Sequence, residues 1–440
     1  MKRLMFAIVC LFMLGVATAC QDGDAPIAND ESVNDLLIDD ELVDDPAGNE
    51  ELETTLSIAL GGGYSNPAVP AKSGPVYKKI HTFEEEHQEI SIEVKELMYM
   101  MGTSFPIDPF PDIIELAPHQ VRWVADGELE SLDSVVQMVG WSGAYADLIA
   151  RMTVNGDVRM LPLKAEPMVV YYDEQVFQLL NLTFPHDDWT WDDFVNVSKQ
   201  LDAYGYNISI PDSFEAYEPI IKGLGGSYIS PDGSAFTGFL DSEATASAFE
   251  QVIASIHAQR ANSESRERPV VLGIDWPSNL YGQLIDNADL KLARMPIFPD
   301  GNRYNTMFTT GLSMSTKSKL KTTALDLIKS IIGEDEREAI RSLNYNALTS
   351  REGRYQVAPP VQMDQLLAIM EQETAIATPN PFQLHTNITF YYGLLYNHED
   401  VFLKSFPQMF EQGTATPILS QLAGIIDTLY SSMRGNWRGL

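Results

Sequence analysis

Residues that could carry out catalytic or metal chemistry are few and widely spaced in this chain of 440 residues. The 7 histidines include no H-E-x-x-H pair, the spacing that places two imidazoles on one helix face to bind zinc. Both cysteines, Cys10 and Cys20, lie in the first twenty residues, so the remainder has no thiolate ligand or nucleophile and no disulfide. We therefore expect neither a metal site nor a cofactor.

Glycine and serine motifs of common enzyme classes are also missing. Residues 223–226 read GLGG, which lacks the spacing of a P-loop or of a dinucleotide-binding turn. No G-x-S-x-G sequence marks a nucleophilic serine on a strand-to-helix turn. With 62 acidic residues, composition alone identifies no catalytic carboxylate pair. No motif gives a positive sign of catalysis, and we predict that the protein is not an enzyme.

The N-terminal residues have the pattern of an export signal. Lys2 and Arg3 precede an apolar stretch, residues 4–16, that is too short to span a bilayer as a mature helix. Residues 17–20 read ATAC and resemble a bacterial lipobox, although leucine is commoner than alanine at the first position. We predict a lipoprotein signal peptide over residues 1–20, with Cys20 as the lipidation site and the protein anchored outside the cytoplasm. An ordinary signal peptide with an incidental cysteine is the alternative.

The formal net charge of -33 is unevenly distributed. Residues 21–53 contain 13 acidic residues and no Lys or Arg. Such a segment repels itself and has few large apolar side chains to bury, so we predict a disordered acidic tether. The overall charge also argues against nucleic acid as a partner, because phosphate binding needs a basic face.

The folded part begins as an α/β pattern. Residues 54–60 form a β-rich run that ends in three glycines, and apolar residues then recur at helical spacing over 76–83. Residues 90–94 and 112–116 read as two more strands. Strands joined by a helix of this length predict right-handed βαβ units and a parallel sheet.

A second series of elements begins at residues 168–172, a continuous apolar run typical of a buried parallel strand. The pattern then predicts further strands and helices, and a helical C-terminal stretch. The strands are expected at 208–210, 270–272 and 290–294, and the helices at 176–180, 191–201, 244–256, 322–332 and within 360–433.

Five short segments occur in the order found in one family of bacterial proteins. They read PDII at 111–114, GELESLD at 127–133, LP at 161–162 followed by VVYYDEQVF at 169–177, WTWDDF at 189–194 and GLSMSTKS at 311–318. They resemble the P-D-I strand, the G-x-L-x-x-L-D segment, the P…LYYNKDLF crossover, the P-x-T-W-x-E-F helix start and the G-x-x-I-S-K-x-S return strand of bacterial extracellular solute-binding proteins of family 1, the carbohydrate class. Asp173 stands where that family usually has asparagine.

The resemblance implies a two-lobed α/β fold, similar to the type II periplasmic-binding-protein fold, with a hinge, an interlobe cleft and a helical C-terminal part. It places the first crossover near residues 165–168 and the return near 296–304. Lobe one would then comprise residues 54–166 together with 301–440, including the C-terminal helices, and lobe two would comprise 167–300.

Sugars present polar edges and weakly apolar C–H faces, so a sugar site needs aromatic rings beside carboxylate, amide or hydroxyl groups. In open sheets such groups follow the carboxyl ends of strands. On this rule and the resemblance we predict the following ligand-binding residues: Tyr64, Lys164, Glu166, Tyr217, Asp275, Trp276, Thr309, Thr310 and Gly311. Alternatively, Trp276 could cap a helix against the core, and Lys164 could simply pair with Glu166.

Other conspicuous pairs have a structural interpretation. Tyr171 and Tyr172 resemble the adjacent tyrosines of ferric-ion binders, but they lie in an apolar strand, so we expect them to pack in the core. Trp141 follows a helical pattern and is expected in the core as well. Thr190 followed by two aspartates is typical of a helix N-terminus, where a hydroxyl accepts backbone N–H bonds and carboxylates face the positive end of the dipole.

We therefore expect an extracytoplasmic, lipid-anchored protein that captures a sugar or oligosaccharide between its lobes and delivers it to an ABC importer. The expected partners are a small saccharide, the importer's membrane subunits and the membrane through the lipid anchor, with no nucleic acid and a monomeric state. The alternatives are a lipid-anchored carbohydrate-active enzyme, a sensory solute-binding lipoprotein, and a binder of another small solute such as a peptide or polyamine.

Overall fold

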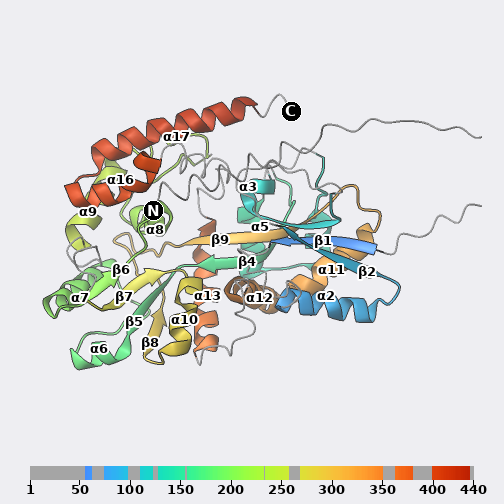
Figure 1. The fold of residues 1–440 in the computed structure, drawn as a ribbon, viewed down its shortest axis with the longest axis horizontal. Helices are drawn as coiled ribbons and strands as arrows, with labels where there is room; N and C mark the ends of the chain where they lie inside the picture. The colour runs from blue at the N-terminus through green and yellow to red at the C-terminus, as the bar shows by residue number, and fades with distance from the viewer. Residues whose placement is uncertain are drawn as a thin grey trace, which may run out of the picture. The chain divides into compact units, whose positions relative to one another are not determined.

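The elements form two α/β lobes, each built on its own sheet (Figure 1). The computed structural model describes residues 55–61, 74–97, 110–121, 127–153, 156–231, 233–256, 268–349, 362–379 and 399–436. The predicted signal peptide with Cys20, the acidic tether and Tyr64 lie outside the described residues.

The first lobe contains a six-stranded sheet in the order β10-β9-β3-β1-β2, in which β4 also pairs with β9. Strands β2 and β3 run parallel to β1, whereas β9 runs antiparallel to both β3 and β4. The predicted parallel strand-helix-strand unit at the start of the fold is therefore confirmed. The strands are β1 (Thr55–Gly61), β2 (Ser91–Leu97), β3 (Ile113–Leu116), β4 (Leu161–Pro167), β9 (Thr306–Met314) and β10 (Thr378–Pro379).

Amphipathic helices pack on this sheet through apolar side chains. In α2 the buried residues are Val76, Ile80 and Phe83, whose spacing of four and three places them on one face. They join the core that contains Leu56 and Ile58 of β1. The helices of this lobe are α2 (Pro75–Glu86), α3 (Pro118–Val121), α4 (Asp133–Val139), α5 (Gly143–Met152), α11 (Lys321–Ile332) and α12 (Glu336–Thr349).

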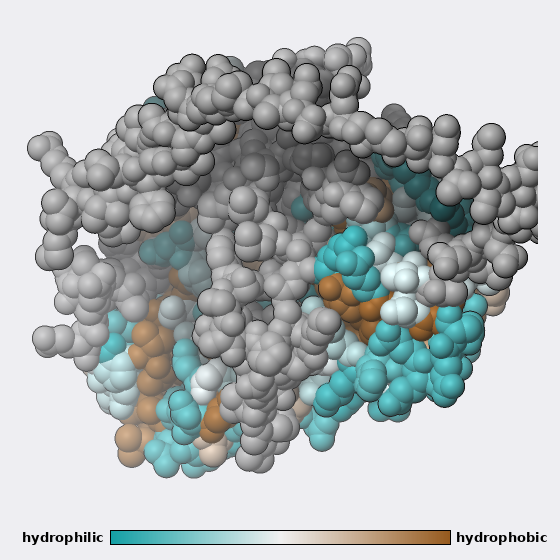
Figure 2. Space-filling view, turned by 45° about the vertical axis from the view of Figure 1, so that its right-hand side comes forward, coloured by the Kyte–Doolittle hydropathy of each residue, from teal (hydrophilic) through white to brown (hydrophobic). Residues whose placement is uncertain are grey.

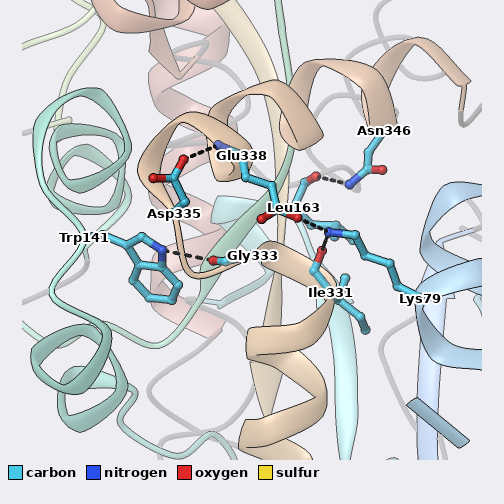
Figure 3. Close-up of polar contacts among 8 residues, drawn as sticks. All are labelled: Lys79, Trp141, Leu163, Ile331, Gly333, Asp335, Glu338 and Asn346. Atoms are coloured by element: carbon cyan, nitrogen blue, oxygen red, sulfur yellow. Dashed lines mark hydrogen bonds and ion pairs between the residues drawn. The ribbon is translucent and has the colours of Figure 1, made fainter. Parts of the chain in front are cut away.

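The turn between α11 and α12 is tied to segments far away in the chain (Figure 3). Trp141 Nε1 donates to the carbonyl of Gly333 in that turn, at 3.1 Å, and the Lys79 ammonium of α2 donates to the last turn of α11, at 3.0 Å. Further along α12, Asn346 Nδ2 donates to the carbonyl of Leu163 on β4, at 3.1 Å. Trp141 is 7% exposed, so its predicted core position is confirmed.

The second lobe contains a four-stranded sheet in the order β6-β7-β5-β8. The predicted strand at 168–172 is β5, and it is buried as expected, but it runs antiparallel to both β7 and β8. The prediction of a parallel strand was wrong because coverage on both faces makes a strand apolar whatever the direction of its neighbours. The strands are β5 (Val169–Asp173), β6 (Asn207–Ser209), β7 (Val270–Asp275) and β8 (Leu290–Ala293).

Helix α7 of this lobe starts with the predicted cap. The Thr190 hydroxyl accepts a hydrogen bond from the Asp193 backbone N–H at 3.1 Å, and the Asp193 carboxylate accepts one from the Thr190 N–H at 2.9 Å. This reciprocal pair is a capping box, and the hydrogen bonds from Thr190 lower the pKa of Asp193. The neighbouring helices are α6 (Glu174–Leu179), α7 (Trp191–Ala203), α8 (Phe214–Gly223), α9 (Glu243–Ile256) and α10 (Pro277–Asp286).

The C-terminal helices α16 (Glu399–Gln412) and α17 (Thr416–Asn436) belong to the second lobe. Phe406 of α16 packs edge-on against Phe214 of α8, with ring centroids 5.4 Å apart, and Leu422 and Ile426 of α17 are buried in the same core. The expectation that all residues after 301 belong to lobe one is therefore corrected. Helical pattern predicts an apolar face but not which of two cores that face will cover.

The chain passes from the first sheet to the second at Met168, between β4 and β5, and returns between β8 and β9. Both passages agree with the expected crossovers. Helix α13 (Met363–Ile376) lies beside them and buries Leu366 and Met370 against residues of β5 and β8.

Hydrophilic residues cover most of the described surface on the right-hand side of Figure 2, with smaller apolar areas between them. Large exposed apolar side chains include Leu179 on α6 and Met138 on α4, which are 76% and 69% exposed. Among the described helices, none is long and apolar enough to cross a membrane.

Candidate functional site

A buried carboxylate lies at the edge of the first sheet where the parallel strands β1 and β3 end. The Glu115 side chain of β3 is 1% exposed. Its Oε2 accepts a hydrogen bond from the backbone N–H of Gly61, the last residue of β1, at 3.0 Å. Its Oε1 accepts one from the Thr310 hydroxyl of β9 at 2.6 Å and lies 2.8 Å from Lys164 Nζ of β4. Burial of this carboxylate is tolerated because donors on three strands, one of them an ammonium group, surround it.

Lys164 and Glu166, two residues apart on β4, take different partners. The Lys164 ammonium pairs with Glu115 of the first lobe. Glu166 Oε1 instead accepts a hydrogen bond from the backbone N–H of Ser278, in the first turn of α10, at 2.6 Å. A carboxylate at a helix N-terminus meets free N–H groups and the positive end of the dipole. The crossover strand thus links polar groups of both lobes.

An aromatic pair lies beside Glu166. In the β4–β9 register Glu166 is opposite Phe308, and the Phe308 ring centroid is 5.0 Å from that of Trp276. Trp276 precedes α10 and is 8% exposed, whereas Phe308 is 37% exposed. The Trp276 backbone therefore occupies the helix-cap position raised as an alternative, and the pair presents mainly the Phe308 ring to solvent. Asp275 Oδ1 accepts hydrogen bonds from the Trp276 N–H at 2.7 Å and from Asn279 Nδ2 at 2.8 Å, which fixes this turn.

The side chains of the two predicted threonines of β9 have different partners because side chains alternate between the two faces of a strand. The Thr310 hydroxyl binds Glu115, whereas Thr309 is 1% exposed and its hydroxyl donates to the Lys164 carbonyl at 2.8 Å. At Gly311 a Cβ would overlap the carbonyl oxygen of Leu161, so glycine permits the close approach of β4 and β9.

Tyr217 packs in the core of the second lobe and not beside Glu166 and Phe308. It is fully buried on α8, with its ring centroid 4.7 Å from that of Phe406 and 5.7 Å from that of Phe410. Burial raises the pKa of its hydroxyl well above the usual value. Its ring is part of the second-lobe core, and Tyr217 therefore stays outside the site proposed below. Tyr171 and Tyr172 are also buried, as predicted.

Sequence reasoning missed two residues of this site, Glu115 and Phe308. Glu115 interrupts an apolar run in β3, IIEL, and an acidic residue inside a buried strand is itself a signal, because such a charge needs partners. Phe308 directly precedes the predicted pair Thr309 and Thr310. Its exposure depends on the register of β9 with β4, which local sequence does not reveal.

The second lobe also contains buried carboxyl groups away from this row, among them Glu215 and Glu218 of α8. Glu218 of α8 is 8% exposed, and burial raises its pKa to about 7, although the nearby Lys222 ammonium acts in the opposite direction. Among the described residues no group of three or more His, Cys, Asp or Glu could hold a metal ion.

The arrangement of two sheets, two crossing segments and a row of polar and aromatic side chains beside them is that of a two-lobed binding protein. Residues 78–369 match the family model described as bacterial extracellular solute-binding protein. The chain belongs to this family, and it is accordingly an extracytoplasmic binding protein.

Solved structures share the fold at low sequence identity. The sugar-binding protein MalE from the phytopathogen Xanthomonas citri has a TM-score of 0.64 and 14% identity, covering 88% of this chain and 100% of its own. An ABC substrate-binding protein from Listeria monocytogenes in complex with cycloalternan has a TM-score of 0.60 and 13% identity, covering 87% and 99%. The cyclic alpha-maltosyl-1,6-maltose binding protein from Arthrobacter globiformis has a TM-score of 0.61 and 14% identity, covering 86% and 99%. No curated protein sequence matches the chain.

Proposed function

We propose that this protein captures a sugar or oligosaccharide in a cleft between its two lobes and delivers it to an ABC importer. Membership of the extracellular solute-binding family supports capture of a solute. The names of the similar structures, which include a sugar-binding protein and a complex with cycloalternan, support a saccharide as that solute.

The observation that carries the proposal is the aromatic pair Phe308 and Trp276 beside Glu166. A half-exposed ring offers a face for the C–H groups of a sugar, and carboxylates beside it accept hydrogen bonds from hydroxyl groups. Glu115 and Lys164 extend the polar row into the first lobe, at the carboxyl edge of its parallel strands. We assign the ligand contacts to Phe308, Trp276, Glu166, Lys164, Asp275, Thr310 and, outside the described residues, Tyr64.

A ligand screen tests the proposal directly. Purified protein is heated with maltose, cycloalternan, cyclic α-maltosyl-1,6-maltose and a wider panel of oligosaccharides, and the melting temperature is recorded. A sugar present at 100 times its Kd should raise the free energy of unfolding by about 2.7 kcal/mol, which gives a clear upward shift. A panel without any shift would count against a sugar ligand and direct the screen to peptides and polyamines.

Two matched variants locate the site. Phe308→Ala should weaken binding of the responding sugar about tenfold, roughly 1.4 kcal/mol, because it removes the exposed ring. Phe184→Ala is the control, because Phe184 is also 37% exposed but stacks on Phe177 in the second lobe. Calorimetry should therefore show a loss for the first variant and none for the second. If the two variants bind the sugar with equal affinity, Phe308 does not contact the ligand.

Recovery of the ligand separates binding from hydrolysis. A labelled oligosaccharide incubated with the protein and analysed by chromatography should be returned intact. Cleavage products would instead establish the carbohydrate-active enzyme that the sequence left open.

We further propose that Cys20 carries a lipid and tethers a monomer to the membrane near the importer. Lipid labelling in cells should mark the wild-type chain and fail for Cys20→Ser. Light scattering on a chain that starts at Gln21, without the predicted signal peptide and lipidation site, should give the mass of one copy. Co-purification with permease subunits would support import, whereas co-purification with a sensor kinase would favour a sensory role.

A further inference from the structure

Helix α13 is held by both lobes. Along its length Leu366, Leu367 and Met370 are buried with residues of β5, β8 and α10 of the second lobe. At its C-terminal end the guanidinium of Arg151, on α5 of the first lobe, donates to the carbonyls of Ala377, at 2.6 Å, and of Ala375 and Thr374, at 3.2 and 3.3 Å. A cation that satisfies the last carbonyls of a helix fixes that end. A change in the angle between the lobes would therefore strain the contacts that α13 makes with one lobe or the other.

The side-chain amide of Asn305 links the two crossing segments. Asn305, just before β9, accepts a hydrogen bond from the Met168 N–H at 3.1 Å and donates Nδ2 to the Met168 carbonyl at 2.8 Å. Met168 is the single residue between β4 and β5. Asn305 is 3% exposed, and its own carbonyl accepts from the Thr378 N–H at 3.1 Å. The side chain thus bonds to both backbone polar groups at the point where the chain changes lobe.

Glu373 of α13 joins this point to the second lobe. Its Oε2 accepts a hydrogen bond from Asn305 Nδ2 at 2.7 Å, and its Oε1 accepts one from Arg294 Nε at 2.8 Å. Arg294 directly follows β8, and the Glu373 side chain is fully buried. A buried carboxylate bound in this way has one favourable geometry, because a shift of either partner would leave a charge without compensation in a low dielectric.

We propose that Glu373 is a positioning residue that sets the angle between the two lobes from α13, without touching the ligand. Removing its carboxylate frees Asn305 and Arg294 to move apart and lets the crossing segments sample other lobe angles. The consequence for ligand affinity rests on the proposed function, since only the population of the binding-competent angle changes.

The test measures the lobe angle without any ligand. The full chain has only Cys10 and Cys20; with both changed to serine, Met138→Cys on α4 and Leu179→Cys on α6 place one dye on each lobe at positions 69% and 76% exposed. Single-molecule energy transfer should give one dominant distance for the otherwise unchanged chain. Glu373→Ala should change the ratio of dominant to other distances by at least about tenfold. Glu373→Gln, which keeps the shape and an acceptor for Asn305, should give a smaller change of the same kind.

A matched control separates positioning from general destabilisation. Asp427 of α17 is also a structural carboxylate, which accepts from the backbone N–H groups of Phe236 and Thr237 at 2.8 Å each, within the second lobe alone. Asp427→Asn should lower the melting temperature and leave the distance distribution unchanged.

An unchanged distribution in folded Glu373→Gln, or an equal change in Asp427→Asn, would overturn the proposal. If Glu373→Ala fails to fold, the Glu373→Gln result decides. Since no sugar is present, failure of the sugar screen would refute the proposed ligand and leave this result standing.

Discussion

The buried carboxyl of Glu218 gives a quantitative prediction for the second lobe. Burial raises its pKa in the folded protein to about 7, against an ordinary value of 4.5. The folded protein therefore keeps a proton that the unfolded chain releases at lower pH. Glu218→Gln preserves the shape of the side chain and removes the ionisation, so it isolates the energetic effect of this proton.

The sign follows from proton linkage. Between pH 4.5 and about 7 the folded state binds more protons at this group than the unfolded state, so the free energy of unfolding falls as the pH rises, and it is constant above that window. The gap between the two pKa values corresponds to about 3 kcal/mol in total. Most of this, about 2 to 3 kcal/mol, is expected between pH 5 and pH 8.

Urea unfolding at pH 5 and pH 8 measures the effect. The advantage of Glu218→Gln over the wild type, as a difference in free energy of unfolding, should grow by about 2 to 3 kcal/mol from the lower to the higher pH. Glu243→Gln on α9 is the control, because Glu243 is exposed and lies in water in both states. A difference for Glu218→Gln that does not depend on pH would refute the reasoning.

Two further predictions concern stability. Thr190→Ala removes the hydroxyl that caps α7 and should lower the free energy of unfolding by about 1 kcal/mol in urea unfolding, whereas Thr190→Ser should retain it; equal loss in both would argue against the cap. Lys164→Met leaves the buried Glu115 carboxylate without its ammonium partner and should cost about 3 to 5 kcal/mol, measured in the same way. Adding Glu115→Gln to Lys164→Met should recover part of that loss, and simple additivity of the two single changes would contradict the pairing.

Much of the architecture could be predicted from local sequence, because each element carries its own periodicity. Val76, Ile80 and Phe83 mark one helix face, and Thr190 marks a helix start, whatever the rest of the chain does. The direction of β5 and the placement of Phe406 could not be predicted in this way. Both depend on partners more than sixty residues away in the sequence, and an apolar face fits more than one core.

The residues of the candidate site could likewise be predicted only where a local motif or a strand end marks them. Lys164 and Glu166 could be found because they follow a short motif on the crossover strand, and Trp276 because it follows a strand end. Glu115 and Phe308 could not be found in this way, because Glu115 meets its partners, and Phe308 lies opposite Glu166, only when β9 pairs with β3 and β4. Tyr217 was a plausible aromatic in a loop until α16 supplied the rings that bury it.

The packing of α17 against the second lobe has a consequence for how this chain reaches its native state. Residues such as Leu419, Leu422 and Ile426 complete a core whose first strand begins at Val169. That lobe therefore requires contacts between residues roughly 250 positions apart in the sequence, and contacts at such separations form slowly. During synthesis or passage through a secretion channel, the core of the second lobe therefore cannot be completed until these late residues arrive, whereas β1, α2 and β2 can pair early. A chain that stops before residue 416 would leave the apolar face that α17 covers exposed to water, and exposed apolar faces of this kind favour aggregation.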